Sequence, residues 1–202
     1  MGPLDADGDG ASTLLTDEIL AGLVPSWVAT REDLNEVEAI NVAAGYRWLR
    51  SQPPTTAVIL TTEFAQRLHR RMFGDVWEWA GTYRRTETNI GVDPWTIAVE
   101  VRRVVDDFTY RLEHAAPTGS TQIDRFCVEY HHRMVKIHPF PNGNGRHARA
   151  CGDALALSLD QPAFTWGGSS TVTDRLTRGT YIEAIRAADD GDLTSLCLFA
   201  RS

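Results

Sequence analysis

The chain has 202 residues, enough for one well-filled domain, and its 43% hydrophobic and 23% charged content is ordinary for a globular protein. A formal net charge of −7 excludes a broad basic surface for nucleic acid or anionic membranes. The sequence opens without a signal-peptide core, no apolar run is long enough to span a bilayer, and the three cysteines form no C-x-x-C pair. We therefore expect a cytoplasmic protein in a reducing compartment, unless a dedicated secretion system exports it without a signal peptide. We expect no direct nucleic-acid or membrane partner.

The periodicity of apolar side chains predicts a mainly helical domain. Residues 1–12 are rich in Gly and Asp, which predicts a disordered acidic tail, and residues 13–202 are expected to form a single domain. The expected helices cover 16–24, 30 to the Pro53-Pro54 pair, about 62–73, a segment ending near 114, a segment through 123–134 that leads to His138, a segment from the glycine-rich loop to Gln161-Pro162, about 173–189, and 192–200.

One segment interrupts the helical pattern. Residues 82–97 mix Thr, Tyr, Val and Ile with Asn89, Gly91 and the Asp93-Pro94 pair. This composition favours extended backbone with a turn, so we predict a short β-hairpin here. The expected fold class is therefore all-α, a helical bundle with one short β-hairpin that we call the flap.

The stretch from His138 to Arg149, His-Pro-Phe-Pro-Asn-Gly-Asn-Gly-Arg-His-Ala-Arg, concentrates the polar chemistry of the chain. Its glycines precede a helix, so backbone N–H groups and the positive end of the helix dipole can converge on an anion. Arg146 and Arg149 are spaced i, i+3, which places them on one helix face. Each guanidinium can bind a phosphate in a bidentate manner. His138 is the residue here that accepts a proton near neutral pH. This combination indicates group transfer from a phosphorylated donor.

Structural interpretations of the neighbouring residues remain open beside the functional ones. His138 alone is also typical of a helix C-terminus, and Asn144 is typical of a turn. The spacing of His131, His132 and His147 matches no zinc pattern, so we reject metal ligation by histidine. His131 is expected to be packed, and the other two are expected either to face solvent or to support the site residues from behind. We also expect Asp153, one turn after Arg149, to orient that arginine.

The 138–149 stretch resembles the signature of Fic (Fido) domain proteins, His-x-Phe-x-(Asp/Glu)-Gly-Asn-Gly-Arg-x-x-Arg. Every position fits except Asn142, which stands where the family has a carboxylate. With the stretch from Phe73 to Arg84, the chain is most similar to the subgroup called mobile mystery protein B, over nearly the whole of 13–202. The resemblance implies a Fic-type helical bundle with a flap and an N-terminal helical extension.

The resemblance also implies an activity, the transfer of AMP from ATP to a Ser, Thr or Tyr hydroxyl of a protein target. It assigns His138 as base and Arg146 and Arg149 as a charge clamp that acts in catalysis and phosphate binding. Mg²⁺ is the family's metal, and Asn142 makes a weak ligand for it. The remaining residues that the resemblance assigns are Asn142, Gly143, Asn144 and Gly145 for the nucleotide phosphates, and Thr86, Thr88, Asn89, Ile90 and Gly91 in the target-binding flap.

Two alternatives stay open, because the glycine-rich loop does not specify the donor. One is transfer of another phospho-group, such as UMP, phosphocholine or phosphate. The other is a non-catalytic nucleotide-binding module that lacks the metal-binding carboxylate.

Many Fic proteins carry an inhibitory helix, (Ser/Thr)-x-x-x-Glu-(Gly/Asn), whose glutamate binds the last arginine. In this chain no glutamate precedes Gly or Asn, and Glu38 is only a distant lookalike. The resemblance therefore suggests a separate inhibitor or a helix-turn-helix partner.

Overall fold

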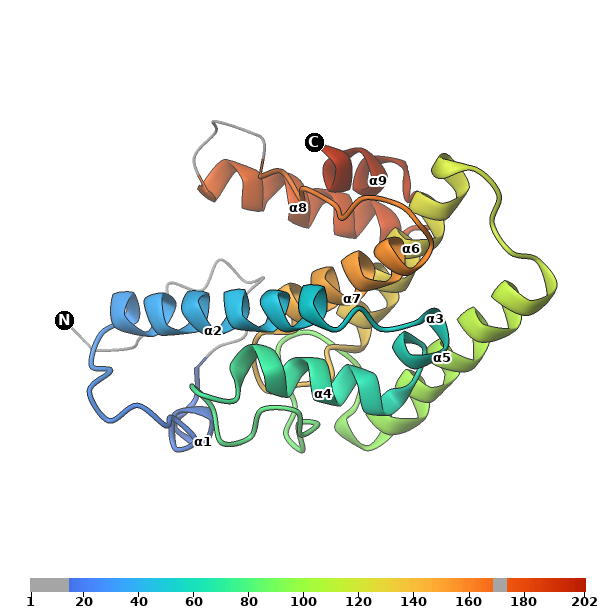
Figure 1. Cartoon of the computed structure of the whole chain (residues 1–202). Coiled ribbons are helices and arrows are strands. Elements are labelled where there is room, and N and C mark those ends of the chain that lie inside the picture. The colour runs from blue at the N-terminus through green and yellow to red at the C-terminus, as the bar shows by residue number, and fades with distance from the viewer. Residues whose placement is uncertain (1–14, 169–173) are drawn as a thin grey trace.

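The computed structural model describes residues 15–168 and 174–202, and these form a bundle of helices (Figure 1). The tail expected over 1–12 lies outside the described residues. The elements are α1 (Asp17–Leu20), α2 (Arg31–Ser51), α3 (Thr56–Ile59), α4 (Thr62–Phe73), the 3-10 turn η1 (Pro94–Thr96), α5 (Ile97–His114), α6 (Ser120–Ile137), α7 (Asn144–Ser158), α8 (Asp174–Asp189) and α9 (Thr194–Arg201).

The helices follow the predicted order, and α4 has the predicted bounds. The start of α2 is the expected one, since Thr30 and Asp33 form a reciprocal capping box with the backbone. The short turns α3 and η1 were not predicted. Each is about one turn long, so neither repeats an apolar side chain often enough to give a helical period.

The α6–α7 pair forms the centre of the bundle. Helix α2 packs on α4 at one side of the pair, and α8 and α9 lie together at another (Figure 1). The side chains of Tyr130, Met134, Cys151 and Leu155 are fully or almost fully buried where α6 meets α7. Because the loop between these two helices carries the signature, its ends are fixed by the best-packed part of the protein.

The predicted β-hairpin is wrong in its secondary structure. Among the residues that the structure describes there is no β-strand; one isolated bridge joins Leu23 and Trp77. Residues 82–93 instead run through turns and bends. The reason is local. The carbonyls of Thr86 and Val92 accept hydrogen bonds from the guanidinium of Arg84, so they do not accept the backbone N–H groups of an opposing strand.

Two tryptophans attach the N-terminal segment to the bundle, as core anchors rather than a stacking platform. Trp77 is buried, Trp79 lies against it with ring centroids 4.8 Å apart, and the Trp79 indole N–H donates to the carbonyl of Ile19 at 3.1 Å. This anchoring brings α1 beside the flap. Within the described parts of the chain, no helix is both long and apolar enough to cross a lipid bilayer.

Candidate active site

His138 ends α6 in an unusual conformation. It caps the helix with φ 54°, in the left-handed region that non-glycine residues seldom adopt, and its side chain is buried. Burial first, and then the nearby positive charge of Arg84, lower the pKa of His138 to about 4, against a hydrogen bond with the backbone of Val135 that raises it. The imidazole is therefore neutral at pH 7, the form that accepts a proton.

The start of α7 has the backbone geometry that was expected around the signature glycines. Gly143 caps the helix with φ 77° and without a side-chain hydrogen bond, so the first N–H groups of α7 lack intrahelical acceptors. A Cβ on Gly143 would lie 2.5 Å from the ring of Phe73, so the loop can pass there only as glycine. Beside Gly145 there is open space, since an added Cβ would meet only the Tyr181 hydroxyl, at 4.0 Å.

Asn144 serves the loop with its side chain. Its Oδ1 accepts from the N–H of Phe140 at 2.8 Å, and its Nδ2 donates to the carbonyl of Phe140 at 2.7 Å. Phe140 itself is fully buried beneath the loop. Asn144 is the first residue of α7 and lacks the left-handed backbone on which the turn interpretation rested; the left-handed residue is Gly143. The Asn144 side chain closes the loop, and its backbone N–H is the group that remains for a phosphate.

His69 of α4 was missed from the sequence, although it supports the same loop. Its Nδ1 accepts from the N–H of Gly81 at 3.0 Å, which leaves Nε2 to donate to the carbonyl of Asn142, also at 3.0 Å. The ring stacks on Phe140 with centroids 3.8 Å apart. Burial holds the pKa of His69 well below its usual value, so the donor arrangement is permanent. The sequence feature that could have identified His69 is its position next to Leu68, on the inward-facing side of α4.

Glu38 of α2 contacts the signature residues, a contact that the sequence analysis did not predict. Its carboxylate forms a 2.6 Å ion pair with Arg146, while its other oxygen accepts from Trp77 Nε1 at 2.7 Å and from Asn142 Nδ2 at 3.2 Å. Glu38 is only 3% exposed. It occupies an inward position of α2, between Leu34 and Asn41, and it binds the first arginine of the signature, not the last.

Arg149 points toward the C-terminal helices instead. Its guanidinium lies over the ring of Tyr181, 5.6 Å from the centroid, and within the described residues it forms no hydrogen bond or ion pair. The expected contact with Asp153 is absent there. Asp153 accepts instead from Tyr46 at 2.9 Å and from Phe164 N and Trp166 Nε1 at 3.0 Å. Burial raises the pKa of Asp153, and these hydrogen bonds and the charge of Arg149 only partly oppose that shift.

His132 and His147, which were expected either to face solvent or to support the site residues, are both buried. His147 lies against the carbonyl of Ala65 at 2.9 Å, and His132 lies 3.0 Å from a carboxylate oxygen of Asp189. The solvent-facing alternative is wrong for His147 because α7 has neighbours on several sides, α2, α3, α4 and α6 among them. His147 instead packs edge-on against Phe140 beneath the signature loop. His131 is packed as predicted, with its Nε2 3.2 Å from the Tyr181 hydroxyl.

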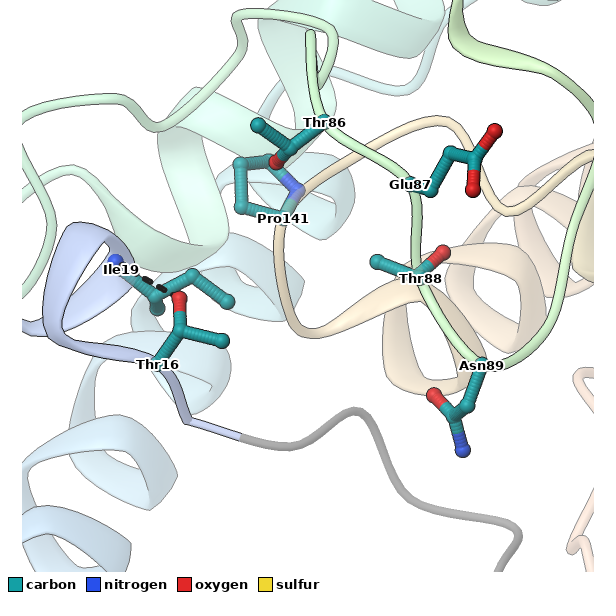
Figure 2. A pocket seen from close by; sticks show the side chains of 7 residues that line it. All are labelled: Thr16, Ile19, Thr86, Glu87, Thr88, Asn89 and Pro141. Atoms are coloured by element: carbon teal, nitrogen blue, oxygen red, sulfur yellow. Dashed lines mark hydrogen bonds between the residues drawn. The ribbon is translucent and has the colours of Figure 1, made fainter.

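A cavity of about 170 Å³ lies between α1 and the flap. Figure 2 shows Thr16 and Ile19 on one side and Thr86 to Asn89 on the other, with Pro141 of the signature loop between them. The flap residue Thr88 donates its hydroxyl to the carbonyl of Ile90 at 2.6 Å. Flap, signature loop and N-terminal helix therefore meet at this cavity, which opens beside the candidate site.

Comparisons with known proteins agree with this geometry. The sequence model of the Fic/DOC family matches residues 59–156, which include α4, the flap, and the signature with both its helices. Residues 59–156 of the chain are therefore similar to the Fic/DOC family. A protein adenylyltransferase Fic of Drosophila grimshawi is 26% identical over 137 residues, 65% of this chain, and protein adenylyltransferase fic-1 of Caenorhabditis elegans is 30% identical over 132 residues, 62% of it. The chain spans about a quarter of the length of these relatives.

Solved structures show the same fold over a larger share of the chain. The N-terminal Fic domain of a Bartonella effector protein from Bartonella sp. AR 15-3 superposes with a TM-score of 0.70 at 16% identity, covering 92% of each chain. BepC of Bartonella tribocorum, solved with bound AMPPNP, gives 0.68 at 16% identity, covering 98% of this chain and 94% of that one. At these identities the likeness establishes the fold, and it includes α1, α2, α8 and α9, outside the family match.

The position of Arg149 gives a first prediction. Because Arg149 has no anionic partner among the described residues, a donor phosphate can bind it without displacing one. Arg149→Ala should weaken ATP binding by roughly 10- to 150-fold, the loss of one charge-assisted hydrogen bond. Calorimetric titration measures it, with Arg103→Ala as control, since Arg103 pairs with Glu100 on the exposed face of α5. Equal ATP affinity for Arg149→Ala and the control would show that the arginine does not bind the donor.

Proposed function

We propose that this chain transfers AMP from ATP to a Ser, Thr or Tyr hydroxyl of a protein target. The proposal rests on one observation: His138 lies at one end of a short loop, 139–143, and the uncapped start of α7 lies at the other end. A base and a phosphate cradle are thereby held next to each other by the packed α6–α7 pair. The adenylyltransferase names of the relatives support the choice of AMP.

In the proposed reaction, a target hydroxyl gives its proton to neutral His138 while its oxygen attacks the α-phosphorus of ATP. The bond between the α-phosphorus and the bridging oxygen breaks, and pyrophosphate leaves with that electron pair. The N–H groups of Gly145 and its neighbours at the start of α7, with Arg146 and Arg149, would stabilise the charge that builds up on the phosphates. The flap residues, Thr86 to Gly91, would hold the target segment through main-chain hydrogen bonds.

Transfer is tested directly by following a labelled phosphate from ATP onto protein. Purified protein is incubated with a cell extract and ATP labelled either at the α- or at the γ-phosphate. AMP transfer predicts protein-bound label from the α-labelled donor alone. Label from the γ-labelled donor would instead indicate phosphate transfer, competition by UTP or CDP-choline would indicate UMP or phosphocholine transfer, and ATP binding without any transfer would leave the non-catalytic module.

The residues around position 142 do not fit a tight Mg²⁺ site. Asn142 Oδ1 accepts from the N–H of Gly143 at 2.8 Å, and Nδ2 donates to Glu38, so both amide atoms are already hydrogen-bonded. A neutral amide is also a poorer ligand than the carboxylates that usually hold Mg²⁺. The proposed mechanism therefore has no step through a metal, and ATP remains the only small-molecule requirement.

Asn142→Asp should restore metal use. We expect wild-type ATP affinity to be nearly independent of Mg²⁺, whereas the variant should bind ATP and transfer AMP only with Mg²⁺, and transfer faster. In the variant, the new carboxylate would also replace the Asn142 Nδ2 group, which lies 3.2 Å from Glu38 Oε1. Two negative carboxylates at such a distance repel each other strongly. Calorimetry with and without Mg²⁺ tests this, together with peptide mapping, because Asn142 precedes Gly143 and is prone to deamidation. Equally fast transfer by undeamidated wild type at saturating Mg²⁺ would contradict it.

Glu38 acts in this proposal as an internal restraint on the donor site. Its carboxylate occupies Arg146, so a donor phosphate must displace it. Glu38→Gln keeps the shape and the acceptor for Trp77 but removes the charge, and ATP affinity should rise by about tenfold, the equivalent of one net hydrogen bond to a charged group. The matched control is Glu36→Gln, an exposed residue of the same helix. Unchanged affinity in calorimetry would mean that Glu38 only packs α2. A separate inhibitor or helix-turn-helix partner stays a prediction.

We propose the cytoplasm as the location, supported by three cysteines that form no disulfide, two of them buried. The expectation of no direct nucleic-acid or membrane partner follows from the acidic balance of the sequence and stays a prediction. A protein target is the partner that the proposed reaction requires.

A further inference from the structure

Arg84 is a cation held inside the protein by carbonyl oxygens. It is 3% exposed. Its Nε donates to the carbonyl of His138 at 2.7 Å, and its Nη1 to that of Thr86 at 3.0 Å. Its Nη2 lies between the carbonyls of Val92 and Ile137. Burial lowers the pKa of this guanidinium, although the charges of Asp93 and Glu87 raise it, and no described carboxylate forms an ion pair with it.

These bonds converge on the backbone of the candidate base. The guanidinium takes the carbonyls of Ile137 and His138, and the backbone N–H of Arg84 donates to the next carbonyl, that of Pro139, at 2.9 Å. All three carbonyls of the turn that holds His138 in its left-handed conformation are thus bound by one residue. Such a conformation costs free energy and persists only where its surroundings fix it.

The same guanidinium holds both ends of the flap. Its other two carbonyl partners, Thr86 and Val92, bracket the flap, and the N–H of Val92 also donates to Ile137 at 3.2 Å. The spacing between flap and base is tight. A Cβ on Gly91, which has φ 108°, would lie 2.6 Å from the Cβ of His138 and 2.7 Å from Nη2 of Arg84. Flap and base therefore meet in van der Waals contact around Arg84.

We propose that Arg84 is the positioning residue of this site, which fixes the His138 ring and the flap relative to each other as one unit. The inference rests on the proposed function only in calling His138 the base. Because the hydroxyl acceptor must sit between flap and base, a single support for both sets where the target oxygen meets the imidazole. The charge has a second effect, since a buried cation beside His138 disfavours imidazolium and keeps the ring neutral.

The test uses two substitutions of Arg84 and readouts that need neither donor nor target. Arg84→Gln removes the charge and most of the donors; Arg84→Lys keeps the charge but cannot reach all four carbonyls. The His138 titration is followed by NMR of the imidazole, assigned by its loss in His138→Asn. We expect the His138 pKa to rise from about 4 in Arg84→Gln and to stay low in Arg84→Lys. In both variants, amide exchange across 86–92 should speed up by about tenfold or more.

Arg70→Gln is the matched control, because Arg70 also donates to a loop carbonyl, that of Ala80 at 3.3 Å, away from His138. It should change neither readout. Gly91→Ala, which forces the flap off the base, should speed the same exchange even if Arg84→Gln fails to fold. An unchanged His138 titration and unchanged flap exchange in folded Arg84 variants would overturn the proposal. Absence of AMP transfer by the wild type would defeat the proposed function and leave these readouts standing; where transfer is measured, kcat should fall more than the KM for ATP rises.

Discussion

His138→Asn is expected to lower AMP transfer by about 10²- to 10⁴-fold, the usual contribution of a general base, with little change in ATP affinity. The imidazole is neutral and buried at the end of α6. The proposed donor contacts lie on α7, which includes Arg146 and Arg149, so removing the ring should leave them intact. Asparagine is the better substitution, because it tolerates the left-handed backbone of residue 138 more readily than alanine does.

The measurement is single-turnover transfer from α-labelled ATP, with calorimetry for ATP binding. His138→Ala should show the same loss of transfer with a somewhat lower stability, which separates loss of the base from backbone strain. His114→Asn, at the exposed end of α5, is the control for replacing a histidine. Transfer by His138→Asn at the wild-type rate would remove His138 from the role of base.

The sequence was most informative where a function fixes many neighbouring residues. The stretch from His138 to Arg149 predicted the loop, the helix that follows it and the cradle, because two glycines and a helix start dictate their own backbone geometry. The bounds of α4 were equally clear, since Phe64, Leu68 and Met72 repeat at helical spacing and a cap precedes them. Local chemistry determines such features, and local chemistry can be read from one sequence.

The residues that were missed act over long sequence distances. Glu38 reaches Arg146 across 108 positions, and His69 reaches Asn142 across 73. Nothing near Glu38 marks its partner, because the pairing depends on how α2 packs against α4 and α7. The flap prediction failed for a local reason instead: residues with high strand propensity form no strand here, since the nearby Arg84 supplies hydrogen bonds that a partner strand would have made.

The free energy of unfolding should fall steeply as the pH drops below about 6.5. Burial lowers the pKa of His131 to about 3 and those of His138 and His147 to about 4, and His69 is shifted in the same direction. In the unfolded chain these histidines bind protons near pH 6.5, while the folded protein does not. Unfolding therefore takes up protons throughout the window from about 6.5 down to about 4, and acid favours the unfolded state.

Each such histidine contributes about 1.4 kcal/mol per pH unit inside that window, so the three with the clearest shifts give roughly 4 kcal/mol between pH 6 and pH 5. Asp153 works against them, because burial raises its pKa and the folded state then gains a proton first. Urea unfolding followed by tryptophan fluorescence at pH 7, 6 and 5 measures the slope. Replacing His147 by Gln should reduce the slope by about one proton. Equal stability at pH 7 and pH 5 would show that the buried histidines, His138 among them, take up protons within the folded protein. His138 would then not be held in the neutral form that a general base requires.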